Sequence, residues 1–301
     1  MTDTERELLS THELSPATVL LFDSHDVARR NTRQALEASG LSRIREVSTS
    51  RELRHRLDER QHDLLVMAST HGDDGVADLL LALRRHYFGP DPFAPVVATI
   101  ASKDDRLVQR IAFSGVDHII GKPFSGEQVR RRLEALVDRR HRFIETLDYL
   151  GPDRRTATAR SGSDEAIVVP NALKARVTRS IEFAPSAENI ATAKSALARL
   201  RTRNIGRRIA AAVKSMGRTK ATGAEDWDVQ FAMLCRCLDA LGGTSAIAEG
   251  RGVADAIDAL RRAALRFRDE EREDRAPAHQ EMIARAKLLL DVLQKTLARS
   301  G

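Results

Sequence analysis

Four short apolar blocks, separated by stretches with helical spacing, constrain the fold of this chain more than any other feature. The blocks occupy residues 18–22, 64–67, 95–100 and 117–124. Each is bounded by polar residues, which is typical of strands buried on both faces of a parallel sheet. Apolar residues recur at helical intervals over residues 27–39, 50–59, 76–86 and 104–114. This alternation predicts an α/β fold with a doubly wound parallel sheet.

Polar residues at the edges of these blocks resemble the landmarks of the response regulator receiver family. The landmarks are Asp23, Asp63, Asp74-Gly75 and Lys122-Pro123-Phe124. The last is the most specific, because it follows a short strand and precedes an amphipathic helix. The resemblance covers residues 17–148. It implies a five-stranded, flavodoxin-like receiver fold with a cis peptide bond before Pro123, since cis bonds are essentially confined to proline.

The resemblance also implies which residues would carry phosphoryl transfer, and most of those positions are altered. In the family, two acids and an acceptor Asp hold Mg²⁺, a Lys and a Thr or Ser bind the phosphoryl oxygens, and an aromatic residue follows the Thr inward. The retained positions are Asp23 as the first acid, Lys122 and Pro123. The altered positions are Ser24 at the second acid, Ala68 at the acceptor, Ile100 at the Thr and Ile119 at the aromatic residue. Because alanine has no nucleophilic atom, the resemblance implies a degenerate receiver, or pseudo-receiver.

Two further expectations concern this degenerate pocket. Thr99 lies one residue before the Thr position, so its side chain should point to the opposite face of the strand. Lys122 should pair with Asp23, or failing that with Asp26, because an unpaired buried charge is unfavourable. The alternative is a displaced acceptor, which would be Asp63, Asp73 or Asp74.

Apolar residues continue at helical spacing beyond the last strand, which predicts an unusually long final helix. The pattern starts at Ser125, an expected N-cap, and runs to Asp148. At 1.5 Å per residue this helix would be about 35 Å long, more than one domain edge needs. We expect its second half, over residues 139–144, to form a connecting or dimerising helix. The alternative is a helix that ends early.

Composition divides the rest of the chain into segments. Residues 1–16 indicate a polar N-terminal tail that lacks the features of a secretory signal. Residues 149–185 indicate a linker, because much of this stretch is polar and rich in Ser, Thr, Gly and Arg. Its apolar segment, residues 166–177, is either a docking peptide or the entry strand of a second domain. The all-α domain, 186–301, is expected to form a bundle of helices over 186–216, 226–241, 246–272 and 277–299.

Charge is unevenly divided between the two halves. Residues 1–150 hold 22 Lys or Arg against 24 Asp or Glu, whereas residues 151–301 hold 27 against 19. The basic patch comprises Lys194, Arg199, Arg201, Arg203, Arg207, Arg208 and Lys214. It indicates a solvated helix face or a face that docks an acidic protein surface. The alternative is a nucleic-acid site made of phosphate contacts, although no aromatic residue is present there to stack on a base.

The remaining features bear on the class of function. No apolar run approaches the roughly 20 residues that span a bilayer, so we expect a cytoplasmic protein without membrane contact. Cys235 and Cys237 lack a second pair of ligands, which favours packing over metal binding. Motifs for nucleotide binding, hydrolysis and metal catalysis are absent, so we expect no enzyme activity and no cofactor. We interpret the chain as a bacterial signalling protein of a two-component phosphorelay. Its expected partners are a sensor kinase, a phosphotransfer protein, another regulator or a second copy bound through the last receiver helix.

Overall fold

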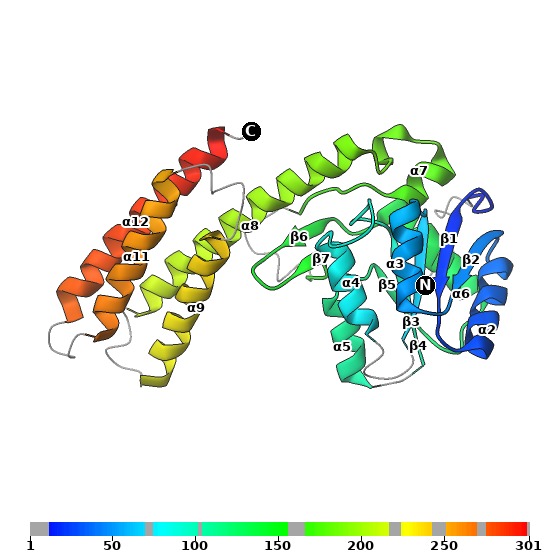
Figure 1. Ribbon diagram of the computed structural model, residues 1–301, viewed down its shortest axis with the longest axis horizontal. Helices are drawn as coiled ribbons and strands as arrows, with labels where there is room; N and C mark the ends of the chain where they lie inside the picture. Colours follow the sequence, from blue (N-terminus) through cyan, green and yellow to red (C-terminus); the bar gives the residue numbers. More distant parts are fainter. Residues whose placement is uncertain are drawn as a thin grey trace, which may run out of the picture. The chain divides into compact units, whose positions relative to one another are not determined.

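The computed structural model describes residues 12–69, 75–101, 104–155, 166–216, 224–242, 251–269 and 275–299. The chain forms two compact units (Figure 1). The first consists of the residues up to Ile144 together with Tyr149–Leu197, and the second of Glu145–Asp148 with Ala198–Gly301. Among the described residues, no helix is both long and apolar enough to span a bilayer.

A five-stranded parallel sheet forms the centre of the first unit, which confirms the predicted doubly wound α/β fold. Its strands, in chain order, are β1 Thr18–Phe22, β2 Arg43–Val47, β3 Leu64–Ser69, β4 Val96–Ile100 and β5 His118–Gly121. They pair in the order β2-β1-β3-β4-β5. The connecting helices are α2 Asp26–Ala38, α3 Ser50–Glu59, α4 Val76–Arg84, α5 Asp105–Phe113 and α6 Gly126–Arg139.

Alternating side chains of the strands enter two separate cores, one on each face of the sheet. Leu20 of β1 and Leu65 of β3 pack with residues of α3, α4 and α5. Leu21 of β1 and Val66 of β3 pack with residues of α2 and α6. Both faces are therefore covered, as the near-continuous apolar strand sequences require.

Helix α6 begins where the sequence predicts but ends much earlier. Ser125 caps it with a complete capping box, in which Gln128 is the reciprocal partner. The prediction of a helix running to Asp148 is wrong, because the chain turns extended at Arg140, with φ −54° and ψ 133°. The next residues form a short two-stranded sheet of β6 Phe143–Glu145 and β7 Leu150–Pro152. The connecting or dimerising extension over residues 139–144 therefore does not exist as a helix.

The segment after residue 165 belongs to the first unit, so the prediction of a linker over 149–185 is wrong for its described parts. Ile167 exchanges two backbone hydrogen bonds of 2.8 Å with Phe143. The following elements are α7 Ala172–Thr178 and the 3₁₀ helix η2 Ile181–Phe183. Leu173 of α7 is fully buried in the core that α2 and α6 share. This outcome corresponds to the docking-peptide alternative for residues 166–177.

The expected polar tail also contributes to this core. Leu14 is only 1% exposed and lies in the same cluster as Leu173. A tail over 1–16 is therefore wrong for residues 12–16, while residues 1–11 lie outside the described residues.

The second unit is helical, as predicted. Its helices are α8 Ala187–Met216, α9 Ala224–Gly242, α11 Arg251–Asp269 and α12 Arg275–Arg299. One core contains Ile209 of α8, Leu238 of α9, Leu260 of α11 and Leu289 of α12, together with the buried Cys237. The predicted boundary at residue 186 is the start of α8, but the compact unit begins within that helix, at Ala198, and includes Glu145–Asp148.

A buried histidine at the start of β3 should make the first unit acid-sensitive. His62 is 5% exposed, and neither ring nitrogen has a hydrogen-bond partner among the described side chains and backbone. Burial lowers the pKa of His62 to about 4. The unfolded chain takes up this proton near pH 6.5, whereas the folded chain does not until about pH 4. Stability is therefore full above pH 6.5 and falls as the pH decreases, by about 2 kcal/mol between pH 7 and pH 5.

Pulse proteolysis in urea, with fragments of the first unit identified by mass, measures this loss at the two pH values. We expect His62→Leu to remove that share of the pH dependence. His55→Leu is the matched control, because the His55 side chain is 66% exposed. An unchanged pH dependence in His62→Leu would show that the ring is already protonated or solvated.

Candidate functional site

The centre of the candidate site is an ion pair at the carboxyl edge of the sheet. Asp23 follows β1, is fully buried and accepts a hydrogen bond of 2.9 Å from the Lys122 Nζ atom through its Oδ2 atom. The other carboxylate oxygen accepts the backbone N–H of His25 at 3.0 Å. Lys122 follows β5, and its backbone N–H donates to the Ile100 carbonyl at 2.7 Å. The predicted Asp23–Lys122 pair is confirmed, as is the cis bond before Pro123.

Ala68 lies beside this ion pair in the sheet. Phe22 of β1 pairs with Met67 of β3, so Asp23 comes next to Ala68 in the parallel register. Ala68 is 4% exposed and presents only a methyl group at this point. Ile100 is a buried aliphatic residue and Ile119 a half-buried one, so neither of these two positions supplies a replacement nucleophile.

Two residues close to Asp23 in sequence that could help to bind a metal ion, Ser24 and Asp26, are both exposed. Ser24 is exposed, and its hydroxyl contacts the His25 ring at 3.2 Å. Asp26, the fallback partner of Lys122, is exposed and instead pairs with Arg29 at 2.6 Å. Within the described ranges, no group of three His, Cys, Asp or Glu side chains is arranged to hold a metal ion. Among the described residues of this edge, the one buried carboxylate is Asp23, and the Lys122 ammonium already neutralises it, so these residues do not fit the Mg²⁺ that the receiver fold implies.

The displaced-acceptor alternative is wrong for Asp63. Its backbone N–H donates to the Thr18 carbonyl, which places it at the amino end of β3, away from Ala68. Its carboxylate accepts from the Thr18 backbone and hydroxyl, both at 2.8 Å, and pairs with Arg176 of α7 at 3.1 Å. Asp73 and Asp74 lie outside the described residues.

Two hydroxyl groups are buried near the ends of strands β3 and β4. Ser69 and Thr99 are at most 1% exposed, and their hydroxyl oxygens have no partner in the part of the chain that the structure describes. Thr99 lines a small space with Val97 and Ile120, which belong to the core under α2 and α6. Its predicted orientation away from the Ile100 side is therefore confirmed. The Thr position of the family, which is Ile100 here, therefore offers no hydroxyl at the carboxyl edge of the sheet.

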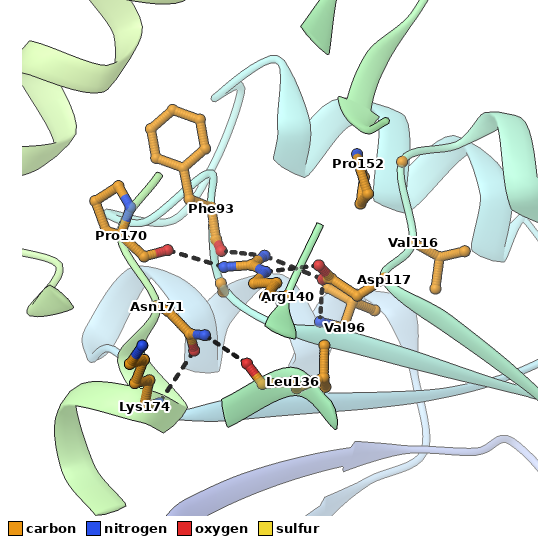
Figure 2. A network of polar contacts seen from close by, with 12 residues as sticks. Phe93, Val96, Val116, Asp117, Leu136, Arg140, Pro152, Pro170, Asn171 and Lys174 are labelled. Atoms are coloured by element: carbon orange, nitrogen blue, oxygen red, sulfur yellow. Dashed lines mark hydrogen bonds and ion pairs between the residues drawn. The ribbon is translucent and has the colours of Figure 1, made fainter. Parts of the chain in front are cut away.

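Sequence reasoning missed a second polar cluster, at the opposite edge of the sheet (Figure 2). Asp117 accepts hydrogen bonds from Arg84 at 3.0 Å, from Arg140 at 2.6 Å and from the Val96 backbone at 2.8 Å. All three charged side chains are at most 6% exposed. Burial alone would raise the pKa of Asp117, but Arg140 and Arg84 hold it below its ordinary value. The cluster is structural, because every partner is an arginine or a backbone group.

The basic patch of the sequence does not form one free cationic face. Lys194 contacts the His86 ring at 2.9 Å in the first unit. In the second unit, Arg201 pairs with Glu145 at 3.6 Å and Arg208 with Asp148 at 3.3 Å. Of the other members, Arg203, Arg207 and Lys214 are exposed and Arg199 is half-buried. Part of the excess charge is therefore used inside the chain.

Comparisons with known proteins identify a family for part of the first unit. Residues 19–134 match the model of the response regulator receiver domain. No curated protein matches the chain. An orphan response regulator of H. pylori is 17% identical, and the alignment covers 40% of this chain and 96% of that one, with a TM-score of 0.34. Chemotaxis protein CheY4 of Vibrio cholerae is 18% identical over 39% of this chain and 96% of that one, with the same TM-score of 0.34. A response regulator from Thermotoga maritima is 20% identical over 39% and 94%, also with a TM-score of 0.34.

Residues 19–134 therefore match the response regulator receiver domain, and this match supports a role in two-component signalling for that part of the chain. The match ends within α6, and the helical region that follows lies beyond it.

Proposed function

We propose that this chain is an atypical response regulator whose receiver domain is not phosphorylated at the usual site. The observation that carries the proposal is the buried Asp23–Lys122 ion pair beside the methyl group of Ala68. In this arrangement the lysine neutralises a carboxylate of the chain itself. An incoming phosphoryl group would find neither a nucleophile at Ala68 nor a free ammonium.

The same residues argue against a phosphoryl-driven switch. Ile100 and Ile119 stand where the family has a Thr and an aromatic residue, and neither can donate a hydrogen bond to a phosphoryl oxygen. Burial of Ile100 favours its present position by an amount on the order of 1.5–3 kcal/mol. A ligand can shift an equilibrium only through different affinities for two states, and these positions offer phosphate no such difference.

The chain would then act by protein–protein contact and without turnover. Its partners would be a sensor kinase, a phosphotransfer protein or another regulator of the pathway, with location in the cytoplasm. A homodimer through α6 stays a prediction, although the helical extension that suggested it is absent. Nucleic-acid binding by the basic patch also stays a prediction, and the pairing of Arg201 and Arg208 with acids weakens it.

Incubation with acetyl phosphate and Mg²⁺, followed by intact mass measurement, tests the proposal. We expect no added phosphoryl group on the natural chain. Ala68→Asp is the matched variant, because it places a carboxylate next to Asp23 in the sheet register. An acid-stable, base-labile phosphoryl group mapped to residues 63–74 of the natural chain would contradict the proposal.

A further inference from the structure

A cationic pocket lies beside the end of α6, between that helix and the segment that carries α7 and η2. Its volume is about 180 Å³. The floor is apolar and includes Val137, Val169 and Phe183, while the exposed Val168 stands at its edge. Pockets for cofactors and drug-sized ligands usually measure about 300–1,000 Å³. This one is smaller and suits one or two side chains.

The rim of the pocket is predominantly basic. His141, Arg142 and Lys174 line it, and none of them has a carboxylate partner in the ranges that the structure describes. The Lys174 ammonium lies 3.9 Å from the centroid of the Phe183 ring, and this cation–π contact holds it at the pocket without using its three N–H donors. The one acid of the rim, Asp138, is bound to the His12 ring at 2.7 Å.

Hydrogen bonds within the chain hold one wall of the pocket. The Arg140 guanidinium donates to the Pro170 and Phe93 carbonyls, both at 2.8 Å, in addition to its bonds with Asp117. The Asn171 side chain donates to the Leu136 carbonyl at 2.7 Å and accepts the Lys174 backbone N–H at 3.1 Å (Figure 2). Arg140 and Asn171 are therefore hydrogen-bonded within the chain. His141, Arg142 and Lys174 can instead contact a partner.

We propose that this cationic pocket binds an acidic peptide segment of a partner protein, in which a carboxylate lies next to a branched aliphatic side chain. The aliphatic group would fill the apolar floor, and the carboxylate would pair with Lys174 and Arg142. A nucleic acid fits less well, because the lysine covers the Phe183 ring that would otherwise stack on a base. The inference rests on the proposed action by protein contact and names the surface where that contact occurs.

The test uses the full chain with ¹³C-labelled valine and leucine methyl groups, and the peptide N-acetyl-Glu-Leu-Leu-Glu-amide as the probe. We expect the methyl signals of Val168 and Val169 to shift as the probe is titrated. The shifts should give a Kd in the millimolar range, a weak affinity that suits so short a peptide. The peptide N-acetyl-Lys-Leu-Leu-Lys-amide should leave them in place. The double variant Arg142→Glu, Lys174→Glu should bind the acidic probe at least tenfold more weakly, and the exposed Val168→Asp should do the same without changing a cation.

Arg131→Glu is the matched control, since Arg131 is an exposed arginine of α6 that does not line the pocket. Its affinity should stay within twofold of the natural chain. The proposal is wrong if the basic peptide produces the same shifts, if the double variant binds normally, or if an oligothymidine shifts these methyl signals instead. Binding that appears only after removal of residues 1–11 would also overturn it, because the chain itself would then be the occupant. Phosphoryl uptake in the mass experiment would contradict the proposed function alone and leave these outcomes unaffected.

Discussion

Replacement of Asp117 by asparagine should lower the unfolding free energy of the first unit by about 3–5 kcal/mol. Asp117 is the shared anion between Arg84 and Arg140, whose side chains are 1% and 6% exposed. The amide keeps the shape of the side chain but removes its charge. Two guanidinium groups would then remain buried without the carboxylate to which they are hydrogen-bonded, and this loss of compensation, more than the loss of a contact, causes the destabilisation.

Hydrogen exchange in the full chain measures this effect separately from the second unit. Amides of β4 and β5 should exchange roughly a hundred- to several-thousand-fold faster in Asp117→Asn than in the natural chain. Asp78→Asn is the matched control, because it removes the exposed pair between Asp78 and Arg110. Exposed pairs contribute about 0–1 kcal/mol, so the control should change exchange less than about tenfold. Equal effects of the two variants would show that the buried cluster does not stabilise the fold.

Truncation of Phe143 to alanine should also destabilise the first unit, by about 3–5 kcal/mol. The Phe143 ring is fully buried and stands edge-on to Phe93, with 5.9 Å between the ring centroids. The guanidinium groups of Arg84 and Arg140 lie 5.2 and 5.0 Å from its centroid. Alanine would leave a cavity next to the buried charges, and the neighbouring backbone bonds to Ile167 would lose their support.

The loss should be visible first in the segment that pairs with β6. We expect protection from hydrogen exchange to fall in residues 166–178 before it falls in the central strands. Phe113→Ala provides the comparison, since Phe113 is 67% exposed and has an aromatic contact of its own with Tyr149. Protection of residues 166–178 that survives Phe143→Ala would mean that α7 docks independently of this ring.

The resemblance to the receiver family supplied the fifth strand and the Asp23–Lys122 pair, whereas local pattern predicted the other four strands. It failed at Arg140 for a physical reason. The apolar spacing of Phe143 and Leu147 fits a continuing helix, and nothing local to residue 140 opposes one. The helix ends because the Arg140 side chain bonds to Asp117, Phe93 and Pro170, which are distant in sequence. A pairing between an arginine and acceptors contributed by three segments leaves no trace in periodicity.

The sequence predicts docking of residues 166–177 only as one of two alternatives, for a similar physical reason. Residues 166–177 are apolar enough to pack, but the sequence does not say against what. Their site is completed by Leu133 and Leu136 of α6 and by Leu14, which lies before the first strand. Three regions must meet before this core is complete, and Leu14 lies more than a hundred residues before the other two.

This discontinuity also governs the order in which the protein can fold during synthesis. The sheet is fully translated once β5 has emerged, yet the core under α2 and α6 still lacks Leu173, and Asp63 still lacks Arg176. The ribosome must therefore produce about 50 more residues before the nascent domain can bury its last hydrophobic side chains, which at 5–20 residues per second takes several seconds. Through that interval the incomplete core exposes apolar surface to which chaperones could bind.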